Sequence, residues 1–315
     1  MPIRIPDNLP ARKTLEDEGV YVMDSTRAAR QDNRPLSIGL LNLMPNKERT
    51  ETQFTRLIGA TPLQVELTLV RVTDHQSKNT SEDYLNTFYR TWEEVREHKF
   101  DGFIVTGVNA LKERVSDEDI WPEVQQILRW TETNVLSSLF LCWGAKAALK
   151  HFHDVESTKH RQKLFGLFEH RLVSDKTGLL FGFPDVFSVP VSRWKSPRRE
   201  DILKHGKLEI VADSEEAGPN IMVESGPYDR GRFLYPRRVY ILNHPEYDTE
   251  TLGVEYKRDS AANRDWPLPL HYFPKDDPRE TPRNSWRHTA HIYTNWIKAL
   301  YEATPYNIED IPRTF

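Results

Sequence analysis

Residues 139–149 read Leu-Phe-Leu-Cys-Trp-Gly-Ala-Lys-Ala-Ala-Leu, and this segment is the strongest indication of the fold class. The apolar run that ends at Leu141 is typical of a buried strand, and the residues after Cys142 favour a helix. We therefore expect Cys142 on a tight strand-to-helix turn that exposes its side chain above a sheet. The N-terminus of the following helix lowers the pKa of such a thiol, and the small residues after Trp143 let the helix pack closely beneath the turn. The pattern predicts a cysteine nucleophile.

Cys142 is the only cysteine among the 315 residues. A single cysteine excludes an internal disulfide and a cysteine-based metal cluster within one chain. A free cysteine is more often buried packing than a nucleophile, and only the predicted turn reverses that interpretation here. The nearby pair His151 and His153 lacks a third ligand close in sequence, so we expect no metal site.

Strands and helices alternate through the first half of the chain. Apolar and alternating runs predict strands at 37–44, 63–72, 100–107 and 135–141, and helical spacing predicts helices at 50–59, 81–98 and 117–130. Such alternation implies βαβ crossovers and a doubly wound, mostly parallel sheet with helices on both faces.

The second half of the chain has a different pattern. Short apolar runs at 209–212, 221–224 and 238–242 are separated by Pro and Gly, and a final helix is expected near 286–301. These runs indicate an antiparallel portion of the same sheet. We predict one α/β domain over residues 1–315, with an N-terminal extension at 1–36 and a core at 37–306.

Charge and composition exclude several classes of protein. The chain has 43 basic and 47 acidic side chains without a long block of one sign, so we expect no nucleic-acid partner. No segment resembles a signal peptide or a membrane span, which predicts a cytoplasmic protein. No Walker-type loop and no Gly-x-Gly-x-x-Gly occurs, so we expect no bound nucleotide or redox cofactor.

A base for the cysteine follows the apolar run at 239–242. His244 lies in the segment Asn-His-Pro-Glu-Tyr-Asp, and Pro245 stiffens the chain between it and Glu246. A carboxylate two residues beyond the imidazole can fix the tautomer of the ring. A histidine at the end of a strand is more often a structural residue, but its combination with the Cys142 turn favours a catalytic role.

Longer motifs occur along nearly the whole chain. They include Gly39-Leu-Leu-Asn-Leu-Met-Pro-Asn-Lys47 and the segments 61–66, 88–89, 101–107, 142–143, 163–166, 192–193, 244–248, 272–274 and 304–306. In this order they resemble the homoserine O-succinyltransferase and O-acetyltransferase family of methionine biosynthesis. The cysteine turn with a distal His-x-Glu also resembles the wider class I glutamine amidotransferase superfamily, whose sheet is flavodoxin-like.

The resemblance implies a role for each matching residue. Cys142 would accept the acyl group, His244 would be the general base and acid, and Glu246 would be its partner. The backbone N–H of Trp143 is our candidate for the oxyanion site. Substrate contacts are implied for four further residues, which are Lys47, Lys163, Ser192 and Arg258. Lysines suit the phosphates of coenzyme A, and the Arg258 guanidinium can grip an acceptor's carboxylate through two hydrogen bonds. The resemblance also implies acyl-CoA as co-substrate and a homodimer.

The sequence departs from the family's pattern at five positions. Leu111 stands where the family usually has Glu or Gly, the residue that sorts acetyl from succinyl donors, and its size weakly favours a short acyl group such as acetyl. The other four departures are Lys146 in place of Gln, Val191 in place of His, Asn243 in place of Gly, and His271 in place of Asn.

Four interpretations follow. The first is acyl transfer from acyl-CoA to L-homoserine through a thioester on Cys142. The second is an acyltransferase of the same family that uses another amino alcohol or amine. The third is a glutamine amidotransferase-like or cysteine hydrolase, which is disfavoured because the turn reads Leu-Cys-Trp-Gly rather than Gly-x-Cys-x-Gly. The fourth is a binding or regulatory protein that has kept the fold but lost turnover, which is disfavoured because Cys142, His244 and Glu246 are all retained.

Overall fold

The computed structural model describes residues 3–6, 8–17, 22–23, 34–73, 79–110, 112–204, 206–230, 233–263 and 266–311. Within these residues, twelve strands form one sheet. The strands are β1 (Ile3–Arg4), β2 (Val22–Met23), β3 (Leu36–Leu41), β4 (Val65–Arg71), β5 (Arg90–Thr91), β6 (Phe100–Val105), β7 (Val135–Leu141), β8 (Ser157–Leu172), β9 (Val186–Pro197), β10 (Leu208–Ser214), β11 (Gly218–Arg230) and β12 (Phe233–Ile241).

The sheet has a parallel part and an antiparallel part. Its order is β2-β1-β4-β3-β6-β7-β12-β11-β10-β8-β9, with β5 paired to β4. Neighbouring strands from β2 to β12 run parallel, and those from β12 to β9 run antiparallel. The predicted α/β fold with a mostly parallel sheet and an antiparallel portion is confirmed. The pairing of β12 with β7 places the His244 segment beside Cys142, because both follow the carboxyl ends of adjacent parallel strands.

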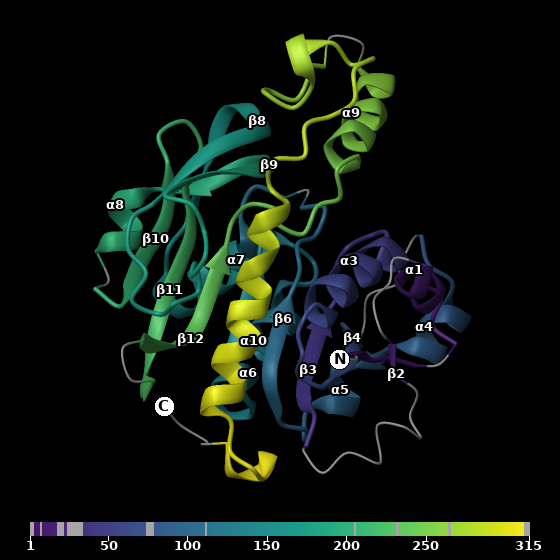
Figure 1. Cartoon of the computed structure of the whole chain (residues 1–315), viewed down its shortest axis with the longest axis vertical. Coiled ribbons are helices and arrows are strands. Elements are labelled where there is room, and N and C mark those ends of the chain that lie inside the picture. Colours follow the sequence, from purple (N-terminus) through teal and green to yellow (C-terminus); the bar gives the residue numbers. More distant parts are fainter. Residues whose placement is uncertain are drawn as a thin grey trace.

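Helices cover both faces of the parallel part (Figure 1). The α-helices are α1 (Ala11–Asp17), α3 (Lys47–Gly59), α4 (Glu82–Phe88), α5 (Trp92–Val95), α6 (Trp121–Asn134), α7 (Trp143–His153), α8 (Arg199–Leu203), α9 (Thr251–Ala262) and α10 (His291–Ala303). Short 3₁₀ helices lie at Val115–Asp117, Pro274–Asp276, Arg287–Ala290 and Ile308–Asp310.

The strand before Cys142, β7, packs against the helices on both faces of the sheet. Leu139 and Leu141 pack in the cluster that contains Trp296 of α10, whereas Phe140 packs on the other face with Val124 of α6 and with α7. All three strand residues are almost fully buried, so β7 contributes apolar area to both faces. A strand buried on both sides gives the turn that follows it a rigid base.

Two predicted helices differ from the observed ones. The stretch 81–98 is not one helix, because Thr91 caps a separate helix through a capping box with Glu94 and Arg90 pairs with Val70 of β4. The helix expected at 117–130 begins at Trp121 and ends at Asn134, with Pro122 in its first turn. A capping box sets the start of the helix in the first case, and Pro122 lies in the first turn in the second.

Several elements were not expected from the sequence, including the long strands β8 and β9. Part of the segment predicted as an extension contributes to the sheet, because β1 pairs with β4, and Leu15 of α1 is fully buried. Helix α9 was missed because only Thr251 and Leu252 of it are buried, which leaves almost no apolar periodicity to detect. Figure 1 shows α9 at the top of the view, beyond the carboxyl end of β12.

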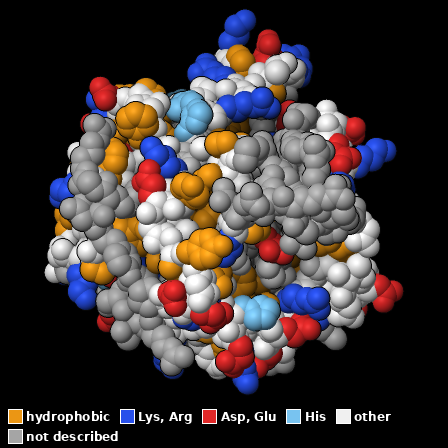
Figure 2. Space-filling model, turned by 60° about the horizontal axis from the view of Figure 1, so that its bottom comes forward, with side chains coloured by type: hydrophobic (Ala, Val, Ile, Leu, Met, Phe, Trp, Pro, Cys, Tyr) orange, Lys and Arg blue, Asp and Glu red, His pale blue; other side chains and the backbone are white. Residues whose placement is uncertain are grey.

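The surface carries mixed charge. On the face shown in Figure 2, the coloured acidic and basic side chains are interspersed, with apolar side chains between them. Among the described helices, none is long and apolar enough to cross a membrane.

Candidate active site

Cys142 occupies a strained turn between β7 and α7. Its φ of 51° and ψ of −111° lie in a region that non-glycine residues rarely adopt, and its N–H donates to the Ile241 carbonyl at 2.7 Å. A Cβ at Gly144 would lie 2.7 Å from the carbonyl oxygens of Val105 and Thr106, so only glycine allows α7 to begin this close to β6. The predicted strand-to-helix turn is confirmed, and it holds the sulfur above the sheet.

His244 and Glu246 form a hydrogen-bonded pair beside the thiol. His244 Nδ1 and Glu246 Oε1 are 2.7 Å apart, and both side chains are buried. The other ring nitrogen of His244 remains for the Cys142 thiol, with which the imidazole shares a hydrogen bond. The ring is also stacked on Tyr247 at a centroid distance of 4.1 Å. The backbone N–H of His244 donates to the Pro190 carbonyl. These contacts fix the orientation of the imidazole.

The charges around Cys142 favour the thiolate. Burial raises the pKa of the Cys142 thiol, but the positive charges of His244 and Lys146 outweigh it and lower that pKa from 9.0 to about 7. Burial lowers the pKa of His244, but the Glu246 carboxylate and the Cys142 sulfur raise it by more. The pKa of His244 therefore lies above its usual value. The pair therefore approaches a thiolate and an imidazolium, the ionic state of an activated cysteine nucleophile.

A pocket of about 460 Å³ opens onto the sulfur. Its lining includes Cys142 and His244, and three of the predicted substrate residues, Lys163, Ser192 and Arg258. They come from α7, β8, β9 and α9 and from the segment after β12, so elements from both parts of the sheet build one cavity.

One carboxylate, that of Glu255, contacts several polar side chains on the substrate side of this pocket. Glu255 of α9 accepts hydrogen bonds from Ser192 Oγ at 2.5 Å and from the Tyr247 hydroxyl at 2.7 Å, and it lies 3.5 Å from Lys163 Nζ. Lys163 also lies 3.3 Å from Asp259 and over the ring of Phe165. The wall therefore offers both negative and positive groups to a zwitterionic ligand.

The remaining predicted site residues lie elsewhere or outside the described residues. Lys47 does not line this pocket, and its ammonium donates to the Asn42 carbonyl at 2.6 Å near the start of α3, where burial lowers its pKa to about 8. Trp143 is the first residue of α7, so its N–H has no carbonyl within the helix to pair with. Leu111 lies outside the described residues.

Sequence reasoning missed two residues of this pocket. Tyr247 closely follows His244 and Glu255 lies on α9, but no local pattern distinguishes either from a surface residue. Lys146 was noticed as a departure from the family pattern, and the structure shows that it lines the pocket with Cys142.

The comparisons with known proteins agree on the class. A solved glutamine amidotransferase from Thermotoga maritima is 15% identical and has a TM-score of 0.50, with 86% of this chain and 98% of that chain covered. At this identity the likeness shows the fold alone, the α/β fold of class I glutamine amidotransferases.

Sequence comparison defines the family more closely. The model of the family described as homoserine O-succinyltransferase matches residues 2–306. A curated relative from Pelagibacterium halotolerans, named homoserine O-succinyltransferase, is 51% identical over 99% of this chain and 98% of its own length. Another from Rhizobium leguminosarum bv. trifolii, named homoserine O-acetyltransferase, is also 51% identical over 99% of both chains. The chain belongs to the homoserine O-succinyltransferase family, and it is an acyltransferase enzyme.

Proposed function

We propose that this enzyme transfers an acyl group from an acyl-CoA to the hydroxyl of L-homoserine through a thioester on Cys142. The observation that carries the proposal is the Cys142–His244–Glu246 array at the mouth of the pocket, in a chain whose close relatives are named for acyl transfer to homoserine. A thiolate beside an imidazolium is suited to attack a thioester, and the imidazolium can return the proton to the leaving group.

The first half-reaction forms the acyl-enzyme. The Cys142 sulfur attacks the carbonyl carbon of the donor, the carbon–sulfur bond to CoA breaks, and CoA takes a proton from His244 as it leaves. The backbone N–H of Trp143 faces the developing oxyanion. In the second half-reaction, neutral His244 takes the proton of the acceptor hydroxyl, whose oxygen attacks the thioester and releases Cys142, and the sulfur is protonated or remains a thiolate beside the imidazolium.

Substrate roles are assigned by the pocket and by the resemblance together. Arg258 has an exposed side chain that is bound to Asp259 through Nε, and the rest of its guanidinium can bind the carboxylate of the acceptor. Glu255, with Ser192 and Lys163 around it, is placed to receive the acceptor's ammonium group. Lys47 is buried and does not itself line the pocket, so it would act through the segment at Asn42 that it holds, which leads to the pocket residues Met44 and Pro45.

Several features of the enzyme in the cell remain proposals. We expect one acyltransferase domain, a homodimer in the cytoplasm, and no nucleic-acid or membrane partner. The expectation of a short acyl group rests on Leu111 alone and stays a prediction, and the curated relatives carry the names of both donors.

Intact-protein mass spectrometry tests the proposal directly. The protein is mixed separately with acetyl-CoA and succinyl-CoA, and we expect a mass increase of one acyl group that homoserine then discharges. Cys142→Ala is the control and should show no increase. An adduct that homoserine does not discharge would mean a different acceptor. The absence of an adduct with either donor would reject the thioester mechanism and favour a hydrolase, which an assay for glutaminase activity would then detect.

Glu255→Gln is expected to raise the KM for homoserine about tenfold, because the acceptor's ammonium loses a charged partner. The rate of acyl-enzyme formation should change less than about threefold, since Glu255 is grouped with Ser192 and Tyr247 rather than with the sulfur. Steady-state kinetics with homoserine and single-turnover acylation separate the two effects. Glu250→Gln, at the exposed residue before α9, is the matched control. An unchanged KM would remove Glu255 from the acceptor site.

A further inference from the structure

Lys146 is a buried cation in the reaction pocket. It lies one helical turn beyond Cys142 on α7, and the two residues line the same cavity. The Lys146 backbone N–H donates to the Cys142 carbonyl at 3.2 Å, so Lys146 lies in the first turn of the helix that follows the cysteine. Only 8% of Lys146 is exposed, and the residue lines both this cavity and a smaller pocket beside it.

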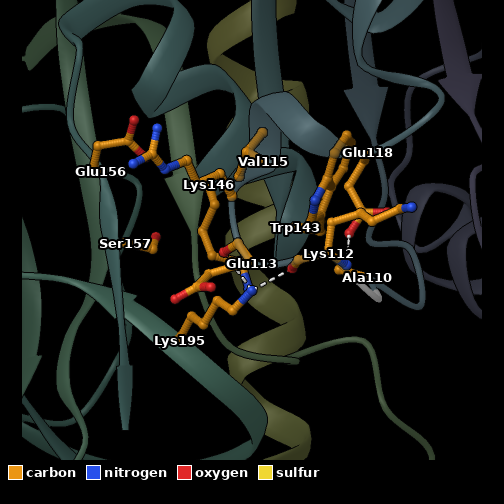
Figure 3. Close-up of a pocket in the computed structure, with 11 residues that line it drawn as sticks. Ala110, Lys112, Glu113, Val115, Glu118, Trp143, Lys146, Glu156, Ser157 and Lys195 are labelled. Atoms are coloured by element: carbon orange, nitrogen blue, oxygen red, sulfur yellow. Dashed lines mark hydrogen bonds between the residues drawn. The ribbon is translucent and has the colours of Figure 1, made fainter.

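The two cationic side chains near Lys146 already donate hydrogen bonds to other groups of the protein. The Arg193 guanidinium donates to Ser196, Asn243 and the Ala217 carbonyl. Lys195 donates to the carbonyls of Lys112 and Glu113 at 2.5 Å, in a small pocket that Lys146 also lines (Figure 3).

The Lys146 ammonium differs from these two cations in its hydrogen bonding. None of the described residues accepts a hydrogen bond or forms an ion pair with its ammonium. Glu118, whose charge raises the pKa of Lys146, accepts a hydrogen bond from the Lys112 N–H at 2.8 Å. The free N–H groups on this wall of the cavity therefore belong to Lys146.

A buried ammonium without a counter-ion is costly. Burial lowers the pKa of Lys146, the Cys142 thiolate and Glu118 raise it, and Arg193 and Lys195 lower it, so that pKa lies below its usual value. An anion in the cavity would relieve this cost. The thiolate cannot serve once it is acylated, because the sulfur is then neutral. The missing partner is an anion that is present when the acyl group is present.

We propose that Lys146 binds the terminal carboxylate of a dicarboxylic acyl group on Cys142, and thereby selects a donor such as succinyl-CoA over acetyl-CoA. The inference rests on the proposed function and names the donor class. An extended four-carbon diacid has about the length that separates residues one helical turn apart, so its far carboxylate reaches Lys146 when its near end is bonded to the sulfur. The charge of Lys146 favours succinyl-CoA, whereas the size of Leu111 favours acetyl-CoA. We expect the charge to have the larger effect.

A different cation in the same cavity is left for the acceptor. Arg258 is on α9, whereas Lys146 is on α7, and both line the cavity. Two carboxylates, one from the acyl chain and one from homoserine, thus meet two separate cations. This division means that loss of Lys146 affects acylation and not the KM for homoserine.

The test is the single-turnover rate of acylation of Cys142, measured by intact mass without acceptor. We expect the wild type to prefer succinyl-CoA, and Lys146→Met to lower the ratio of succinyl-CoA to acetyl-CoA rates about 10- to 100-fold, the factor of one charged hydrogen bond. Loss of a positive charge beside the thiol slows both donors alike, so the ratio is the readout. Lys146→Arg should retain the preference, and Lys146→Gln should repeat the loss independently. Lys150→Met is the matched control, because Lys150 pairs with Asp154 and Glu156 outside the cavity.

The possible outcomes separate the two proposals. A wild type that prefers acetyl-CoA, a ratio in Lys146→Met and Lys146→Gln within about threefold of wild type, or a rise confined to the KM for homoserine overturns the assignment of Lys146 while the acyltransferase proposal stands. If neither donor acylates the wild type, the thioester mechanism fails, and this inference fails with it.

Discussion

His244→Asn is expected to slow acyl transfer roughly a thousand- to a hundred-thousandfold, because the residue both activates the thiol and carries the proton in each half-reaction. The same change should raise the pKa of Cys142. Burial already pushes that pKa upward, and the His244 charge is the larger of the two cationic contributions that hold it at about 7. With only Lys146 left to oppose burial, the pKa should move toward or above the ordinary value of 9.0.

The rate of alkylation by iodoacetamide as a function of pH measures this shift. The chain has one cysteine, so all the alkylation reports on Cys142. In the wild type the rate should rise with pH through about 7, and in His244→Asn the rise should come at clearly higher pH. His98→Asn, at an exposed residue, is the control. A profile in His244→Asn that matches the wild type would show that the histidine does not ionise the thiol.

The catalytic array could be predicted because its signals are local. An apolar strand, one polar residue and a run of helix formers define the Cys142 turn, and His244 and Glu246 are two residues apart. Adjacent parallel strands, β7 and β12, then bring the two signals together. The two local signals need no long-range contact to be recognised, but the parallel pairing of β12 with β7 joins strands far apart in the chain and was not predicted from the sequence.

The substrate side could be predicted only in part, for a physical reason. The contact between Glu255 and Ser192 joins residues 63 positions apart, and α9 has almost no buried face that would mark it as a helix. Lys146 was visible as a departure from the family pattern, but whether a lysine there is solvated or enclosed depends on Arg193 and Lys195, which come from β9. Burial of a charge is a property of the folded cavity and has no sequence signature.

Arg34→Met is expected to destabilise the protein by about 3–5 kcal/mol, the cost of leaving a buried carboxylate without its cation. Asp101 of β6 is fully buried, and Arg34 donates to both of its oxygens, at 2.8 and 3.0 Å. The same guanidinium donates to Thr304 and to the carbonyls of Pro305 and Tyr306. It therefore ties the start of β3 and the segment after α10 to the centre of the sheet.

Chemical denaturation of Arg34→Met, Arg96→Met and the double variant Arg34→Met/Asp101→Asn tests whether the charge is the cause. Arg96 forms an exposed pair with Glu93, so its loss should cost less than about 1 kcal/mol. Asn at position 101 keeps an acceptor for the Ser37 N–H, which now donates to Asp101 at 2.7 Å, but it carries no charge. The double variant should therefore be more stable than Arg34→Met alone, since removing both partners avoids the unpaired buried ion. If the double variant is the less stable of the two, the guanidinium stabilises the fold through its contacts to residues 304–306 and not by neutralising Asp101.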